Sequence, residues 1–107
     1  IIGDVKGKKC LMVDDMIDTA GTICQGAEAL VKNGAKEVYA CATHAVLSGP
    51  AIERFKESPL KEIILLDTIA LPEEKRLNKF VTLSTADIFA KAITCIYDDS
   101  PISTIFD

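Results

Sequence analysis

The stretch VDDMIDTAGT, residues 13–22, decides the fold, because it has the pattern of a strand end, a loop and a helix start. The run CLMVD at 10–14 is short, almost continuously apolar and closed by acids, which predicts a buried parallel strand. Apolar residues recur at helical spacing over 22–33, and Gly34 is a typical residue after a helix end. The stretch therefore predicts a strand, a loop and a helix in succession.

The rest of the chain continues this alternation. Strands are predicted at 37–43, 62–67 and 80–84, and a short helix that turns Ile52 and Phe55 inward follows Pro50. The remaining expectations are a polar connection with one helical turn at 71–76, a helix cap at 84–87, a helix whose apolar face holds Ile88, Phe89, Ala92, Ile93 and Ile96, a break at 98–101, and a terminal strand at 102–106. This order predicts an α/β fold: a three-layer, mostly parallel twisted sheet with helices on both faces.

Composition limits the possible functions. The chain has 107 residues, one domain's worth, and 49% hydrophobic residues are enough for a core. A net charge of −4 and the absence of a basic run argue against binding to nucleic acid or to an anionic membrane. No apolar run approaches the ~20 residues that span a bilayer, and no signal peptide is visible. We therefore expect a cytoplasmic protein.

The cysteines form no pair with metal-site spacing. Cys10, Cys24, Cys41 and Cys95 contain no CxxC motif, and the chain has one histidine. The favoured interpretation is buried free thiols in a reducing compartment, with disulfides or a zinc site as the alternatives.

The second half of the opening stretch suits a phosphate. Ligands of open α/β sheets bind beyond the carboxyl ends of strands, where the first helical N–H groups have no partner within the helix. Gly21 allows close approach of the backbone, and Thr19 and Thr22 add hydroxyl donors. Thr19, Ala20, Gly21 and Thr22 are therefore predicted to bind a phosphate monoester.

The acids before this loop need a different ligand group. A carboxylate accepts hydrogen bonds from a vicinal diol and holds Mg²⁺ directly or through water. Asp14, Asp15 and Asp18 would therefore suit the sugar of ribose 5-phosphate, with Asp14 and Asp15 near a Mg²⁺ ion. The alternatives are that Asp18 only caps the helix and that Asp14 and Asp15 are a solvated strand end.

Three other features have competing interpretations. Paired acids after a first strand, with Asp67 ending the third, also suit a phosphoreceiver domain, although this leaves DTAGT without a role and no strand ends in the expected lysine. His44 ends the second strand, where it is either a ligand or subunit contact or a structural group. Ser48 and Gly49 open either a second anion site or an ordinary helix cap.

The chain as a whole resembles a known family. VDDMIDTAGT resembles the signature of the type I phosphoribosyltransferase fold, which is Rossmann-like. Together with GAKEVYACATHAVLSGPAIER, LPEEKR and SPISTIF, it resembles the ribose-phosphate pyrophosphokinase family, in particular the bacterial enzymes, over essentially all of residues 1–107.

The resemblance carries further expectations. Family members transfer the β,γ-diphosphoryl group of ATP to ribose 5-phosphate with Mg²⁺, giving phosphoribosyl pyrophosphate and AMP. Residues 18–22 match the 5-phosphate loop, and Asp14, with Asp15 beside it, matches the acid that contacts the ribose. The family assembles as rings, often homohexamers built from dimers, and Ser103, Thr104 and Phe106 match a stretch near a regulatory site.

The resemblance also implies what lies elsewhere. The family's catalytic lysine and arginine, its ATP pocket and its main metal ligands match nothing in residues 1–107. We therefore expect a single ribose-5-phosphate-binding domain from the C-terminal part of such an enzyme, truncated at its N-terminal side and inactive alone. The alternative is a non-catalytic phosphoribosyl-binding regulatory module.

Overall fold

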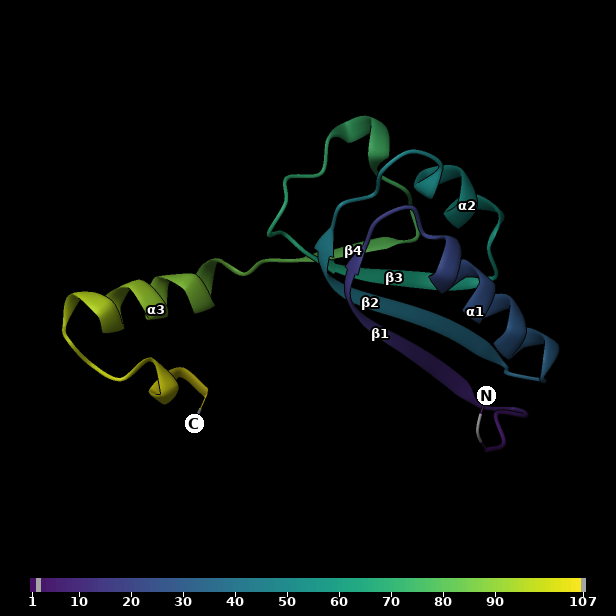
Figure 1. The fold of residues 1–107 in the computed structure, drawn as a ribbon, viewed down its shortest axis with the longest axis horizontal. Coiled ribbons are helices and arrows are strands. Elements are labelled where there is room, and N and C mark those ends of the chain that lie inside the picture. Colours follow the sequence, from purple (N-terminus) through teal and green to yellow (C-terminus); the bar gives the residue numbers. More distant parts are fainter. Residues whose placement is uncertain (2, 107) are drawn as a thin grey trace.

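The computed structural model describes residues 1 and 3–106, which form a four-stranded parallel sheet with helices (Figure 1). The elements in chain order are β1 (Lys9–Ile17), α1 (Gly21–Lys32), β2 (Glu37–Ala45), α2 (Ala51–Glu57), β3 (Leu60–Leu66), the 3-10 helix η1 (Glu73–Lys75), β4 (Phe80–Leu83), α3 (Ala86–Tyr97) and the 3-10 helix η2 (Ile102–Phe106). The predicted α/β class and parallel sheet are confirmed.

The strands lie in sequence order, β1-β2-β3-β4. Crossovers between parallel strands are almost always right-handed, so strands that advance in one direction place every connection on the same face. Figure 1 shows α1 and α2 over one face, and Leu71 and Leu77 of the third connection pack against the same core. Among the described residues, helices therefore cover one face of the sheet, where the sequence predicts helices on both.

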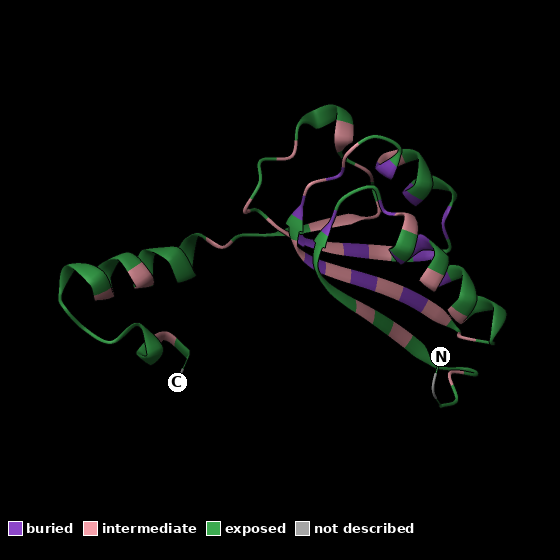
Figure 2. Ribbon diagram, viewed as in Figure 1, coloured by how far each residue is buried: buried purple, intermediate pink, exposed green. Residues whose placement is uncertain are grey.

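The core lies between this face and the two helices (Figure 2). Every second residue of β2 is buried from Val38 to Ala42, and the small alanines allow α1 to approach the sheet closely. Phe55 of α2 has no exposed surface, and its ring meets that of Phe80 edge-on at 5.6 Å between centroids. On the opposite face of β1, Val13 is 74% exposed, so apolar burial is concentrated on one side.

Two boundaries differ from the prediction. β1 continues through the acids to Ile17, because residues 14, 16 and 17 still pair with β2. The predicted strand at 102–106 is wrong, since these residues form η2. The single helical turn expected within 71–76 is confirmed as η1.

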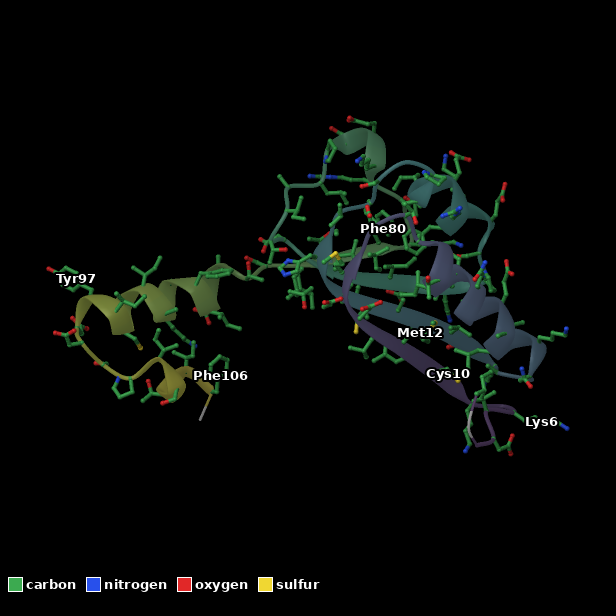
Figure 3. The ribbon with its side chains drawn as sticks, in the orientation of Figure 1. Lys6, Cys10, Met12, Phe80, Tyr97 and Phe106 are labelled. Carbon is green, nitrogen blue, oxygen red and sulfur yellow. The ribbon has the colours of Figure 1, made fainter. Side chains whose placement is uncertain are left out.

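The last helix and η2 form an arm that extends away from the sheet (Figure 1), with α3 packed against η2. The predicted apolar face of α3 exists but is open to solvent: Ile93 and Ile96 are each 66% exposed. Tyr97 and Phe106 lie on this arm in Figure 3, far from the labelled residues of the sheet. The amphipathic pattern therefore predicted the helix correctly, but not where its apolar face would lie.

A polar network joins the amino-terminal ends of three strands. The Glu37 carboxylate accepts hydrogen bonds from the Tyr39 hydroxyl and from Lys61 Nζ at 2.9 Å, and Lys9 Nζ lies 3.7 Å away. The bonds from Tyr39 and then Lys61 lower the pKa of Glu37 from its usual 4.5 to about 2. The folded state therefore holds this carboxylate ionised more strongly than the unfolded chain does.

This shift predicts a pH dependence of stability. Because the folded pKa is depressed, the stabilisation from Glu37 is present above pH 4.5 and is lost as the pH falls toward about 2. We expect the free energy of unfolding of the wild type to fall more steeply across this window than that of Glu37→Gln. Urea titrations at several pH values measure the difference. Equal slopes would contradict it, and Glu53→Gln, at an exposed i,i+3 pair with Lys56, is the control.

Candidate functional site

The loop between β1 and α1 has an unusual backbone. Ala20, the residue before the helix, has φ 66°, a left-handed conformation that non-glycine residues adopt rarely. Its side chain is buried in the core. In the part of the chain that the structure describes, no side chain caps the helix, so the alternative in which Asp18 is only a helix cap does not describe this structure.

The first turn of α1 leaves backbone donors free. The first helical bond runs from the Cys24 N–H to the Ala20 carbonyl at 3.1 Å. Among the described residues, no acceptor is found for the N–H groups of Ala20, Gly21, Thr22 and Ile23. Four free donors at the positive end of a 12-residue helix are a favourable environment for an anion.

These donors border a hollow of about 200 Å³. Its lining residues are Asp14, Met16, Ile17, Asp18, Thr19, Ala20, Gly21, Thr22 and Ile23. The structure thus brings the four residues predicted to bind phosphate together with two of the three predicted acids.

The third acid lies elsewhere. Successive residues of a strand face opposite sides of the sheet, so Asp14 shares the helix-covered face with Met12, whereas Asp15 shares the open face with Val13. The neighbouring Asp14 side chain and the hydrogen bond from the Met16 N–H, 2.8 Å from Asp15 Oδ1, lower the pKa of Asp15. Asp15 is therefore an ionised carboxylate beside the hollow and not part of its lining.

The hollow suits Mg²⁺ only partly. Carboxylate oxygens of Asp14 and Asp18 are the hard ligands that Mg²⁺ prefers, and Mg²⁺ usually retains several waters. No group of three or more His, Cys, Asp or Glu side chains that could hold a metal occurs in the described part of the chain. The donor set fits an ion that is also held by water and substrate.

The loop is supported from behind by residues that follow β2. The N–H groups of Val46 and Leu47 donate to the Ile17 carbonyl at 3.1 and 3.0 Å, and the Ser48 N–H donates to the Asp18 carbonyl at 2.8 Å. Ser48 is therefore committed to this loop. Helix α2 begins after Pro50, and no side chain of the described residues caps it, so the ordinary-cap interpretation is wrong, whereas a second anion site at Ser48 and Gly49 stays a prediction.

Arg54 was missed by sequence reasoning. It lies on α2, and its Nη1 donates to the Thr19 carbonyl at 3.0 Å, a contact across 35 positions of sequence. The residue stands within the GPAIER segment used for the resemblance, but nothing in its local pattern indicates which part of the chain it contacts.

His44 has a defined hydrogen-bonding state. The Thr68 hydroxyl donates to the Thr43 carbonyl at 3.1 Å, so His44 Nδ1, 2.7 Å from the same hydroxyl, must be the donor in that contact. This is the structural contact expected of a lone histidine. When the ring is neutral, Nε2 remains free to accept a bond.

Asp67 also has a structural partner. Its Oδ1 accepts bonds from the N–H and hydroxyl of Thr85, at 2.7 and 2.6 Å, and these bonds lower the pKa of Asp67. The carboxylate thereby fixes the start of α3. Nothing in these contacts favours the phosphoreceiver alternative.

The cysteines are all free. Only Cys24 is buried, and its burial raises the pKa of the thiol. Cys10, Cys41 and Cys95 are half-buried, so burial of the free thiols is confirmed for one of the four.

The tail residues predicted to be regulatory lie in η2. The Thr104 hydroxyl donates to the Pro101 carbonyl at 2.8 Å, Ser103 is exposed, and Phe106 is 76% exposed. The segment that holds them lies on the arm, away from the loop between β1 and α1 (Figure 1). Their regulatory role stays a prediction.

None of the helices in the described part of the chain is long and apolar enough to cross a bilayer.

Comparison with known proteins identifies relatives of the whole chain. A family model described as a phosphoribosyl synthetase-associated domain matches residues 1–107. A ribose-phosphate pyrophosphokinase of Clostridium acetobutylicum is 65% identical over 99% of this chain and 33% of its own length. A ribose-phosphate pyrophosphokinase of Caldanaerobacter subterraneus subsp. tengcongensis is 61% identical over 99% of this chain and 34% of its own length.

A solved structure agrees with the fold. The crystal structure of phosphoribosylpyrophosphate synthetase from Mycobacterium smegmatis superposes with a TM-score of 0.90 at 42% identity, covering 92% of this chain and 33% of that one. The chain therefore spans about a third of the length of the relatives that it matches.

Proposed function

Because the chain belongs to the phosphoribosyl synthetase-associated domain family, we propose that it forms the ribose-5-phosphate-binding part of a ribose-phosphate pyrophosphokinase. Such an enzyme joins ATP and ribose 5-phosphate to give phosphoribosyl pyrophosphate and AMP. The activity of these relatives, which are ribose-phosphate pyrophosphokinases, supports the proposal, and their greater length supports a role for this chain as one part of such an enzyme.

One observation carries the assignment of the site: free backbone donors and carboxylates border the same hollow. The N–H groups of residues 20–23 provide for the 5-phosphate, and the Asp14 carboxylate can accept bonds from the ribose hydroxyls. A phosphate alone would be repelled by Asp14 and Asp18, so a ligand with an anionic end and a hydroxyl end fits best.

The contribution of this chain to catalysis is positioning. Transfer of a diphosphoryl group requires the anomeric oxygen to be held in line with the reacting phosphorus, with cations around the moving oxygens. Holding ribose 5-phosphate at both ends fixes the direction in which its anomeric hydroxyl points. Mg²⁺, when bound, would neutralise charge on the phosphates, with Asp14 and Asp18, which border the hollow, contacting the ion through water.

The isolated chain is proposed to bind without turnover. The family's catalytic lysine and arginine match none of its residues, and the placement of the chain after that catalytic loop stays a prediction. Formation of AMP from ATP and ribose 5-phosphate by this chain alone would contradict the proposal. The alternative, a binding module that regulates, is favoured if the whole protein binds ribose 5-phosphate but produces no AMP.

The split of the site into two halves can be tested directly. In ¹⁵N-labelled protein with Mg²⁺, we expect saturable shifts of the amides of residues 19–22 on addition of ribose 5-phosphate. Asp14→Ala should weaken binding of ribose 5-phosphate by about 10–100-fold, because the diol loses a charged acceptor, and change inorganic phosphate binding little.

The control is Asp87→Ala, which removes an exposed carboxylate on α3 that pairs with Lys91. It should leave both affinities unchanged. If neither ligand shifts the loop amides of the wild type in the whole protein, the proposed site is wrong. If Asp14→Ala weakens both ligands equally, the division of roles is wrong.

A further inference from the structure

The candidate phosphate loop is held by contacts on the side away from its ligand hollow, and we propose that Arg54 is the positioning residue that completes this support. The inference rests on the proposed function, because it concerns the same loop. Arg54 would touch neither substrate nor metal. It would act through the backbone of Thr19, Ala20 and Gly21.

The carbonyl groups of three successive loop residues are all hydrogen-bonded. Those of Ile17 and Asp18 accept the N–H groups of residues 46–48, and that of Thr19 accepts Arg54 Nη1 at 3.0 Å. Three successive carbonyls are thus bonded to the segment that runs from the end of β2 into α2. The contact from Arg54 is the only one of these made by a side chain.

The N–H groups of the loop point away from these bonded carbonyls. In a planar trans peptide the carbonyl and the following N–H point in opposite directions. The Thr19 carbonyl points at the guanidinium, so the Ala20 N–H points away from it. Arg54 does not line the hollow, whereas Thr19, Ala20 and Gly21 do, which places the guanidinium behind the loop. Its bond therefore keeps a carbonyl oxygen from facing the bound phosphate.

The backbone of the loop is strained at Ala20. Ala20 is held at φ 66°, and its buried methyl group explains why this position is not simply free to rotate. Without the bond to the Thr19 carbonyl, the peptide between Thr19 and Ala20 would have no partner that opposes relaxation of this strain. Rotation of this peptide would remove one donor from the hollow and turn an acceptor toward it.

The guanidinium of Arg54 packs closely against the start of α1. A Cβ atom added to Gly21 would lie 3.1 Å from Arg54 Nη1, so the glycine makes room for the arginine. Arg54 forms no ion pair with a carboxylate among the described residues, so no acid competes for its position. The guanidinium is therefore held against Gly21, the first residue of α1.

The test uses the whole protein that carries this chain. We expect Arg54→Met to raise the KM for ribose 5-phosphate and the Kd for inorganic phosphate by about tenfold, with kcat at saturating substrate within about twofold of the wild type. Arg54→Lys keeps a donor and should restore both constants to within about threefold. Lys56→Met, on the same helix with its ammonium on Glu53, is the control and should change neither constant.

A second measurement separates positioning from simple attraction of charge. The ratio of the phosphate Kd of Arg54→Met to that of the wild type is determined at about 0.1 and 1 M salt, where the Debye screening length is about 10 and 3 Å. Positioning predicts an unchanged ratio. A ratio that falls to one at high salt would overturn the inference, because Arg54 would then act only as a charge.

The remaining outcomes are distinct. Wild-type affinity in Arg54→Met, or no recovery in a folded Arg54→Lys protein, overturns the role of Arg54 and leaves the proposed function intact. A wild-type protein that binds neither inorganic phosphate nor ribose 5-phosphate overturns both. Melting temperatures of all variants show whether a loss of binding comes from unfolding, and if Arg54→Met does not fold, the uncharged and shorter Arg54→Gln replaces it in both measurements.

Discussion

Replacing Phe55 with alanine is expected to lower the free energy of unfolding by about 3–5 kcal/mol. Phe55 is among the largest side chains with no exposed surface, and its ring packs edge-on against Phe80. It lies on α2, a seven-residue helix that is too short to be stable without its buried face. Chemical denaturation followed by circular dichroism measures the loss.

The control is the same substitution on the arm. Phe89 of α3 is 54% exposed, so Phe89→Ala should change stability by no more than about 0.5 kcal/mol. A loss for Phe89→Ala equal to that for Phe55→Ala would contradict the open arm and show that α3 is covered in solution.

Leu47→Ala is the second large effect, with an expected loss of about 2–5 kcal/mol. Leu47 is fully buried in the connection between β2 and α2 and has φ 52°, a left-handed conformation that alanine also adopts poorly. Leu47→Gly also removes the buried side chain, but glycine adopts a positive φ without strain. It should therefore be at least as stable as Leu47→Ala. Glycine is ordinarily worse than alanine by about 0.5–1 kcal/mol.

The matched control is Ala45→Gly, two residues earlier at the end of β2 and 2% exposed. Its φ is not positive, so glycine should be destabilising there in the ordinary way. If Leu47→Gly is clearly less stable than Leu47→Ala, the left-handed backbone at this position is wrong. Because Leu47 N–H supports the Ile17 carbonyl, the same variants also report on the loop.

Much of the fold follows from local pattern. The alternation of short apolar runs with helical spacing predicts the strands and α1, and Gly34 marks the end of that helix correctly, at φ 95°. These features depend on neighbours in sequence. Which face of the sheet each helix covers depends instead on the strand order. One order places all crossovers on one face and another divides them between both faces, although the local sequence patterns are identical.

The site was predictable to the same extent. Residues 18–22 are a loop and helix start, as the pattern indicates, and they line one hollow. The separation of Asp14 from Asp15 was missed because β1 was predicted to end at residue 14, whereas a solvated edge strand tolerates acids and continues to Ile17. Arg54 was missed because its contact with Thr19 depends on how α2 packs, which no local pattern contains.

The one-directional order of the strands has a consequence for ligand affinity. In open α/β sheets the binding crevice forms where strand order reverses, because loops from strands on either side of the reversal then diverge and leave a space between them. Among the described residues the order never reverses, and the loop at 18–20 follows β1, the strand at the free edge.

The hollow at this loop is therefore a crevice with one wall. A strand added in parallel at the free edge of β1, with its crossover on the open face, would make the end of β1 a reversal point and supply the opposite wall. Enclosed sites cover most of a small ligand's surface, whereas a single wall leaves much of it in water. The free edge of β1 thus sets how tightly this chain, taken alone, can hold a sugar phosphate.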